Sequence, residues 1–215
     1  MRRRWSGFRR YSRTSVNFNT MFYSFEGIKP VVHPSAFVHE QATIIGDVWI
    51  NENVYIGPGA VLRGDWGRIT VEKGSNVQEN CTIHVFPGKN VLLKESSHIG
   101  HGAIIHGATI EMNTLIGMNA VIMDDAVIGK ESIVGALTFV KQGTIVPERS
   151  VFVGNPGKVV KPVSDEMLKW KTEGTSWYQA LPSSYKKDLL KCDPLTTDDV
   201  NRNRKKGGYA PLKTK

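Results

Sequence analysis

The sequence predicts an all-β fold, a parallel β-helix built from six-residue repeats, followed by a C-terminal α-helix. The first observation is an apolar residue at every sixth position, in three separate runs. The second is a small or aliphatic residue four positions later in the first and third runs, which suits a tight corner. Neither a helical nor a two-residue strand period produces this pattern. The apolar positions are Val32, Val38, Ile44, Ile50, Ile56 and Leu62; Val71, Val77 and Ile83; and Ile110, Ile116, Ile122, Ile128, Val134, Val140 and Val146.

The repeats extend from about residue 32 to residue 156. At three repeats per coil, this length predicts about seven coils, stacked about 4.8 Å apart. The pattern is interrupted over residues 63–70 and by a loop over residues 85–92, and a one-residue slip follows between Ile105 and Ile110. In so regular a coil, we expect the interruptions to mark functional positions.

The pattern changes after residue 157, where a helix is predicted. Ser164 is typical of a helix N-cap, and acidic residues follow it in the first turn. Gly174 weakens this helix, Pro182 is predicted to end it, and a second short helix is expected around residues 185–190. The chain is thus divided into a basic disordered extension (1–20), a β-helix domain (21–163), a C-terminal helical segment (164–192) that contains Cys192, and a basic disordered tail (193–215).

The net charge of +8 comes from the two ends of the chain. Twelve of the 28 Lys and Arg residues lie in residues 2–13 and 201–215, which contain no acid. The rest of the chain contains 16 basic and 20 acidic residues, so the predicted folded part is mildly acidic. This distribution argues against nucleic-acid binding by the β-helix. No run of eighteen apolar residues predicts a membrane span.

The cysteine content and the first twenty residues bear on the expected location of the protein. Two cysteines make no disulfide framework; Cys81 falls on an inward small-residue position, and both are expected to be reduced thiols of a cytoplasmic protein. Residues 1–20 are rich in Arg and Ser and lack acids, as in an organellar transit peptide. The alternative, which we favour, is a translated upstream segment that precedes a natural start at Met21.

Three histidines occupy outward positions next to the loop at 85–92. His84 and His106 each follow an inward isoleucine, so both point out of the coil. Their separation of 22 is one 18-residue coil plus four residues that the loop can absorb, which stacks them one coil apart. The three repeats of a coil form the three flat sides of a triangle. His101 also points outward, but from the side that precedes the one with His84 and His106, so within one chain it cannot easily meet the other two.

A neighbouring chain related by a threefold axis could supply His101. We therefore predict a homotrimer with one divalent metal ion per subunit interface, bound by His84 and His106 of one chain and His101 of the next. Three neutral imidazoles with an open coordination position are typical of a catalytic zinc that activates water. Iron and cobalt are the alternative metals. The remaining histidines, His33, His39 and His98, are interpreted as solvated surface residues.

The chain also contains three sequence elements that resemble those of the γ-class carbonic anhydrases. They are Arg63-Gly64-Asp65, Asn76-Val77-Gln78, and the ligand histidines within the stretch from Ile99 to Gly107 together with His84. The resemblance covers roughly residues 22–163 and implies a left-handed β-helix. Segments near both ends of the domain are most similar to the phenylacetic acid degradation accessory protein and its carnitine-metabolism relative, and for the former the resemblance implies a thioesterase acting on coenzyme A thioesters.

The resemblance also implies roles for residues around the metal. Gln78 would orient the metal-bound hydroxide or the substrate with support from Asn76, and Arg63 and Asp65 would form an ion pair between subunits. The chain departs from the prototypical anhydrases at Trp66, where they carry an acid, and in residues 85–90, which contain no acid to shuttle protons. Trp66 and the apolar Phe86 suit a larger, partly apolar substrate.

Several functions follow from these features and stay open at the level of sequence. The first is a metal-dependent hydrolase in which metal-bound hydroxide attacks an acyl-CoA thioester. The alternatives are a γ-type carbonic anhydrase that hydrates carbon dioxide to bicarbonate, a hexapeptide-repeat acyltransferase with histidine as general base, and a metal-stabilised trimer without enzymatic activity. Bound metal would count against the acyltransferase, because transfer does not require three converging histidines.

Overall fold

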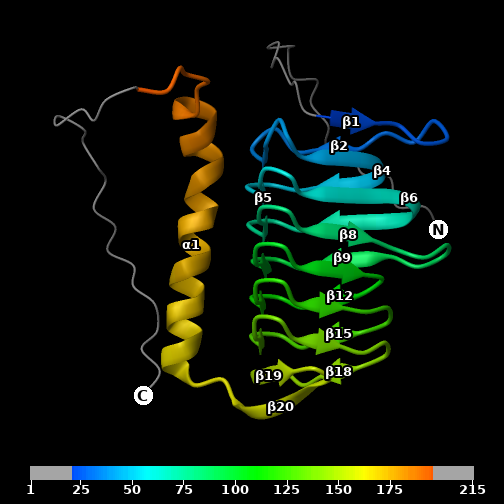
Figure 1. The fold of residues 1–215 in the computed structure, drawn as a ribbon, viewed down its shortest axis with the longest axis vertical. Coiled ribbons are helices and arrows are strands. Elements are labelled where there is room, and N and C mark those ends of the chain that lie inside the picture. Colours follow the sequence, from blue (N-terminus) through cyan, green and yellow to red (C-terminus); the bar gives the residue numbers. More distant parts are fainter. Residues whose placement is uncertain (1–20, 196–215) are drawn as a thin grey trace, which may run out of the picture.

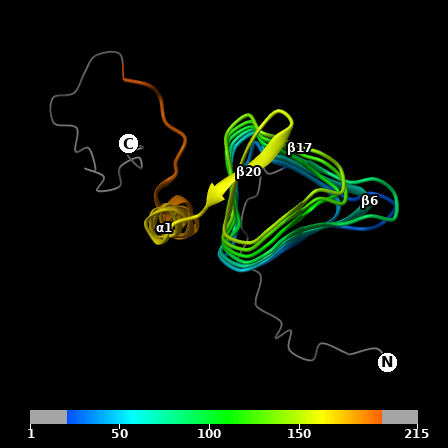
Figure 2. The same cartoon turned by 90° about the horizontal axis from the view of Figure 1, so that it is seen from below.

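The computed structural model describes residues 21–195; residues 1–20 and 196–215, where the basic extension and most of the basic tail are predicted, lie outside the described residues. The described part is a parallel β-helix of about seven coils with one C-terminal helix, which confirms the predicted fold (Figure 1). Viewed along the stack, the coils superimpose as a triangle, and helix α1 lies beside one of its flat sides (Figure 2).

The first coils are joined by two long strands. β1 (Met21–Tyr23) and β2 (Val31–Val32) both pair with β4 (Thr43–Ile50), which pairs with β6 (Val61–Val71). The start of β6 pairs with β8 and its end with β9, so β6 passes around the corner where two faces of the triangle separate. The predicted interruption over residues 63–70 is therefore a continuous strand, with an irregularity in its pairing to β4.

Three stacks of parallel strands form the faces of the triangle. From β6, the first face continues through β8 (Thr82–His84), β11 (Ile104–His106), β14 (Val121–Ile122) and β17 (Phe139–Val140). The second face continues through β9 (Val91–Leu93), β12 (Thr109–Ile110), β15 (Val127–Ile128) and β18 (Ile145–Val146). The third face contains β3 (Phe37–Val38), β5 (Tyr55–Ile56), β7 (Asn76–Val77), β10 (His98–Ile99), β13 (Leu115–Ile116), β16 (Ile133–Val134), β19 (Ser150–Gly154) and β20 (Gly157–Pro162), of which only β19 and β20 pair antiparallel within the described residues.

The interior of the triangle is filled by the apolar residues of the six-residue pattern. All the predicted inward positions are buried except Val32, which packs against the core from the open end of the first coil. Cys81 is buried at a small-residue position, as predicted. Because each inward residue is followed by one that points outward, the pattern also decides which side chains reach the surface.

Helix α1 (Asp165–Asp188) begins where the sequence predicts and ends later. The Ser164 hydroxyl accepts a hydrogen bond from the backbone N–H of Met167 at 3.2 Å. The prediction that Pro182 ends the helix and that a second helix follows is wrong, because α1 continues through Pro182, which is buried against the third face. Cys192 lies beyond the helix and is exposed.

The contacts of α1 are made with the third face. The helix packs against β3, β5 and β7. Beyond Pro182, the ring of Tyr185 lies 5.2 Å from Phe37 and 5.7 Å from Tyr55. A proline in a helix interior costs about 3 kcal/mol of stability. The aromatic contact stabilises the turn beyond Pro182 and so offsets part of this cost. Among residues 21–195, no helix has both the length and the apolar character that crossing a membrane requires.

Candidate metal centre

His84 and His106 lie side by side at the corner between the first and second faces. β8 and β11 are neighbours in the first face, and their register pairs His84 with His106. Nδ1 of His84 lies 3.1 Å from Nε2 of His106. The predicted stacking of these two histidines one coil apart is therefore confirmed, and the loop that follows His84 takes up the four extra residues.

The other ring nitrogen of each histidine in this pair lies within hydrogen-bond distance of a carboxylate. Nε2 of His84 lies 3.1 Å from Oδ1 of Asp65, and Nδ1 of His106 lies 2.8 Å from Oδ1 of Asp124. Asp65 belongs to β6, and Asp124 follows β14, so the pair is held from the coils on either side. The two imidazoles thus turn their remaining nitrogens toward each other.

Burial and the nearby charge of Arg63 favour the neutral form of His84. Arg63 donates a hydrogen bond to Asp65 at 2.7 Å within the same chain. Burial would raise the pKa of Asp65, but the hydrogen bonds from Arg63 and His84 outweigh it and the pKa is lowered. Burial, followed by the charge of Arg63, lowers the pKa of His84 against the opposing effect of Asp65. Neutral imidazole is the form that binds metal ions.

Arg63 and Asp65 form an ion pair within the chain. The two residues lie two apart on β6 and therefore project from the same side of the strand. Their ion pair within the chain positions Asp65 against His84. The expected ion pair between subunits stays a prediction.

Two aromatic side chains flank the histidine pair. The Trp66 ring centroid lies 5.1 Å from that of His84, and the Phe86 centroid lies 4.8 Å from that of His106. Trp66 is 47% exposed and Phe86 is 52% exposed. The guanidinium of Arg63 lies over the Trp66 ring at 5.4 Å. Both residues predicted to contact substrate therefore stand beside the imidazoles with open apolar surface.

His101 lies at a different corner of the triangle, between the third and first faces. It follows β10, and its Nδ1 is 2.5 Å from Oε2 of Glu79. Within the described residues, no group of three or more His, Cys, Asp or Glu side chains is placed to bind a metal ion. His101 is thus separated from the His84–His106 pair within one chain.

Asn76 and Gln78 lie under α1 on the third face. Nε2 of Gln78 donates to Oδ1 of Asn76 at 3.0 Å and lies 2.6 Å from Nε2 of His98. Nδ1 of His98 is 3.4 Å from the Thr175 hydroxyl on α1. The structure therefore does not bring Asn76 and Gln78 to the histidine pair of their own chain.

The prediction that His98 is a solvated surface residue is wrong. α1 covers His98, and the ring centroid of Tyr178 lies 5.0 Å from that of His98. Burial, with the nearby charges of Lys171 and His101, lowers the pKa of His98 to about 3. The six-residue period places His98 outward; it contains no signal for the face on which a later helix docks.

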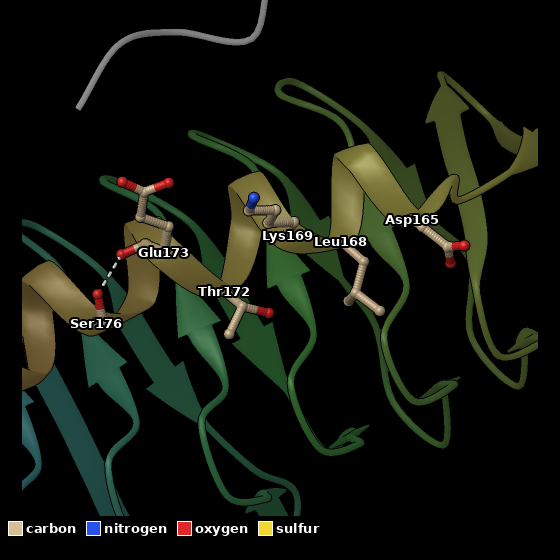
Figure 3. Close-up of a pocket in the computed structure, with 6 residues that line it drawn as sticks. All are labelled: Asp165, Leu168, Lys169, Thr172, Glu173 and Ser176. Carbon is tan, nitrogen blue, oxygen red and sulfur yellow. Dashed lines mark hydrogen bonds between the residues drawn. The ribbon is translucent and has the colours of Figure 1, made fainter. Parts of the chain in front are cut away.

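A hollow on α1 lies apart from these histidines. It is lined by residues of the helix alone, and Ser176 in it donates a hydrogen bond to the backbone carbonyl of Glu173 (Figure 3). None of the predicted site residues belongs to it. The remaining lining residues are Asp165, Leu168, Lys169 and Thr172.

The three histidines share one feature that is common among metal-binding histidines. Each has one ring nitrogen at a carboxylate: Asp65 for His84, Glu79 for His101 and Asp124 for His106. Histidine ligands of metal ions commonly donate their other N–H group to such a partner. Two nitrogens bound to one tetrahedral zinc at its usual bond length lie about 3.3 Å apart. The 3.1 Å between His84 and His106 is close to that value.

Comparison with known proteins defines the family. The carnitine operon protein CaiE of Citrobacter koseri is 48% identical over 186 residues, which cover 86% of this chain and 94% of that protein. The chain belongs to the CaiE family of hexapeptide-repeat proteins. The CaiE protein of Salmonella newport is 49% identical over the same shares of the two chains. Residues 29–64 and 107–142 also match the family described as bacterial transferase hexapeptide (six repeats).

Two solved structures are also similar to this CaiE-family chain in fold. A putative acetyltransferase of Bacillus cereus is 33% identical, covers 78% of this chain and 98% of its own, and has a TM-score of 0.77. A hexapeptide transferase family protein of Anaplasma phagocytophilum is 32% identical, covers 78% and 99%, and has a TM-score of 0.75. The CaiE relatives agree with the predicted carnitine-metabolism subfamily; none of these four names refers to a carbonic anhydrase or a thioesterase.

Proposed function

We propose that this chain forms a homotrimeric, metal-dependent hydrolase of acyl thioesters. The metal ion would be bound at each subunit interface by His84 and His106 of one copy and His101 of the next. The observation that carries the proposal is the carboxylate at one ring nitrogen of every one of these histidines. A divalent metal with an open position supplies an activated water at neutral pH.

The first face supports the trimer. It runs between the corner that carries His101 and the corner that carries the His84–His106 pair, and α1 covers the third face instead. Its outward row is apolar at four of five positions, and Ile104 in this row is 41% exposed. Three such faces packed around a threefold axis would bring each pair next to the His101 of a neighbour. The row consists of Val61, Thr82, Ile104, Val121 and Phe139.

The surroundings of the pair support a thioester substrate. Trp66 and Phe86 offer exposed ring surface on either side of the imidazoles. Such walls suit an acyl chain or a thiol arm better than carbon dioxide. In the hydrolysis, the C–S bond breaks, the acyl carbon receives the hydroxyl group of water, and the thiol leaves with a proton. Hydration of carbon dioxide to bicarbonate is the alternative, and it should be slow because loop 85–90 contains no acid.

Acyl transfer is a second candidate, favoured by one specific observation. His101 is bonded to Glu79 through Nδ1, and its side chain is 45% exposed, as expected of a general base held by a carboxylate. The Bacillus cereus relative is described as a putative acetyltransferase. In this case activity would need an acceptor amine or hydroxyl and would survive removal of metal by a chelator.

The decisive experiment combines metal analysis with a substrate panel. Zn²⁺-loaded protein is assayed on a series of acyl-CoA thioesters, with and without acceptors, and on carbon dioxide. We expect thioester hydrolysis that is lost with the metal, and loss of both metal and activity in His101→Ala. His39→Ala is the matched control, because His39 is bonded locally to the Gln41 backbone. Full metal content and full activity in His101→Ala would exclude the proposed site.

A further inference from the structure

Tyr55 on β5 is a large side chain that points out of the coil and is nevertheless 1% exposed. Its neighbour Ile56 is the inward residue of this strand, so Tyr55 faces α1. Phe37 stacks on its ring with centroids 6.0 Å apart, and Tyr178 and Tyr185 of α1 lie at 5.8 Å and 5.7 Å. These rings enclose the Tyr55 hydroxyl, which must therefore find a partner inside the protein.

That partner is Glu79. The Tyr55 hydroxyl donates to Oε1 of Glu79 at 2.9 Å. Burial, and then the charge of Glu79, raises the pKa of Tyr55 far above its ordinary value, so the hydroxyl is a donor at every pH at which the protein is used. The other oxygen of the same carboxylate, Oε2, lies 2.5 Å from Nδ1 of His101. Glu79 thus connects a buried hydroxyl to a surface imidazole.

This connection determines what His101 presents to its surroundings. A carboxylate at Nδ1 places the proton of a neutral imidazole on that nitrogen and leaves the lone pair on Nε2. Nε2 of His101 forms no hydrogen bond with any residue of the described chain. The Glu79 side chain is itself 32% exposed, so without a second contact it could turn toward water and release the ring.

We propose that Tyr55 is a positioning residue that acts through Glu79 to fix the orientation and tautomer of His101, so that Nε2 of His101 faces the metal ion held by a neighbouring copy. The inference rests on the proposed function, which makes His101 the third ligand.

The first test measures Zn²⁺ affinity in the assembled protein by competition with a chromogenic chelator. Tyr55→Phe keeps the ring and removes the hydroxyl, and we expect Zn²⁺ affinity about 10-fold lower, the smaller end of the loss caused by removing a direct partner of a ligand histidine. Phe37→Leu is the matched control, because it loosens the same aromatic cluster and leaves the hydroxyl, Glu79 and His101 in place. It should lower the Tm and leave Zn²⁺ affinity unchanged. Wild-type affinity in Tyr55→Phe would overturn the proposal.

A double-mutant cycle tests whether Tyr55 acts through Glu79. Glu79→Ala should weaken Zn²⁺ binding by at least as much as Tyr55→Phe. Adding Tyr55→Phe to Glu79→Ala should then cause no further loss, because the connection is already broken. Two independent losses that simply multiply would show that Tyr55 affects the site by another route and would overturn the proposal.

A metal-free measurement separates this inference from the proposed function. The ¹⁵N shifts of the His101 imidazole report which nitrogen carries the proton. We expect the Nδ1–H tautomer in the wild-type protein and a raised share of Nε2–H in Tyr55→Phe. If the wild-type protein binds no Zn²⁺, the proposed function fails, but the effect of Tyr55→Phe on the His101 tautomer still tests the role of Tyr55. The same tautomer in Tyr55→Phe and in the wild-type protein would overturn that role.

Discussion

The three carboxylates that hold the histidines differ in burial. The Asp124 side chain is 5% exposed at His106, whereas the Glu79 side chain is 32% exposed at His101. A buried carboxylate has no water to replace its imidazole partner, and leaving it unpaired is costly. Control over ring orientation is therefore strongest at His106.

The Asp124 carboxylate supports a prediction about metal binding. Asp124→Asn removes the charge that holds Nδ1–H of His106, and metal affinity should fall about 10- to 100-fold. Asp125→Asn is the matched control: it is the next residue, but it is exposed and pairs with Lys89 at 2.7 Å. Such surface pairs contribute little. Zn²⁺ titration of both variants measures the effect, and equal losses in the two would contradict the role of Asp124.

The positions of the histidines could be predicted from sequence, and their partners could not. His84 and His106 follow inward isoleucines, so the six-residue period fixes both their direction and their register. Asp124 lies one coil beyond His106, yet many outward residues share that spacing. Side-chain rotamers decide which of them form hydrogen bonds, and the period contains no information about rotamers.

At the level of elements, α1 is attached to the third face by buried polar contacts. Lys171 is 2% exposed, and its ammonium group donates to the backbone carbonyl of Ser96 at 3.0 Å and to Oδ1 of Asn113 at 2.5 Å. Gln179 donates to the carbonyl of Gly74 at 3.0 Å. The sequence predicts where α1 begins, because the N-cap is local. It does not predict which side of α1 docks on the β-helix. The docking side of a helix is recognised by a stripe of apolar residues, and here that side contains the buried Lys171.

The buried Lys171 should make the free energy of unfolding depend on pH. Burial lowers its pKa from 10.5 to about 7. Between these values the unfolded chain holds a proton that the folded chain has lost, so the free energy of unfolding rises with pH from about 7 to 10.5. The contribution is at most about 1.4 kcal/mol per pH unit. Below pH 7 both states are protonated, and the contribution is constant.

Urea denaturation between pH 7 and 10 at one protein concentration tests this behaviour. Lys171→Met should remove the rising contribution, so its stability curve should converge on or cross that of the wild-type protein as the pH falls. Lys169→Met is the matched control, since Lys169 is exposed on the same helix. Curves for Lys171→Met and wild type that run parallel across this range would show that Lys171 does not titrate there.

At the scale of the whole molecule, the β-helix places the three proposed metal ligands at two different corners, and only a symmetric trimer would bring them together. The His84–His106 pair and His101 stand at opposite corners of the first face, which α1 leaves uncovered. The six-residue period predicts this separation, because each corner is a fixed number of residues from the next. Closed threefold symmetry would then make three equivalent sites, each with two ligands from one copy and one from its neighbour.

Shared sites predict complementation between defective chains. His84→Ala and His101→Ala chains each form no complete site alone, but in mixed trimers an intact pair can meet an intact His101. Random mixing of equal amounts should restore metal binding and activity to about a quarter of the sites. The matched control mixes His84→Ala with His106→Ala, and it should restore none, because both ligands of the pair must come from the same chain. Recovery in the control, or no recovery in the first mixture when each variant folds and assembles, would show that the ligands are not divided between copies in this way.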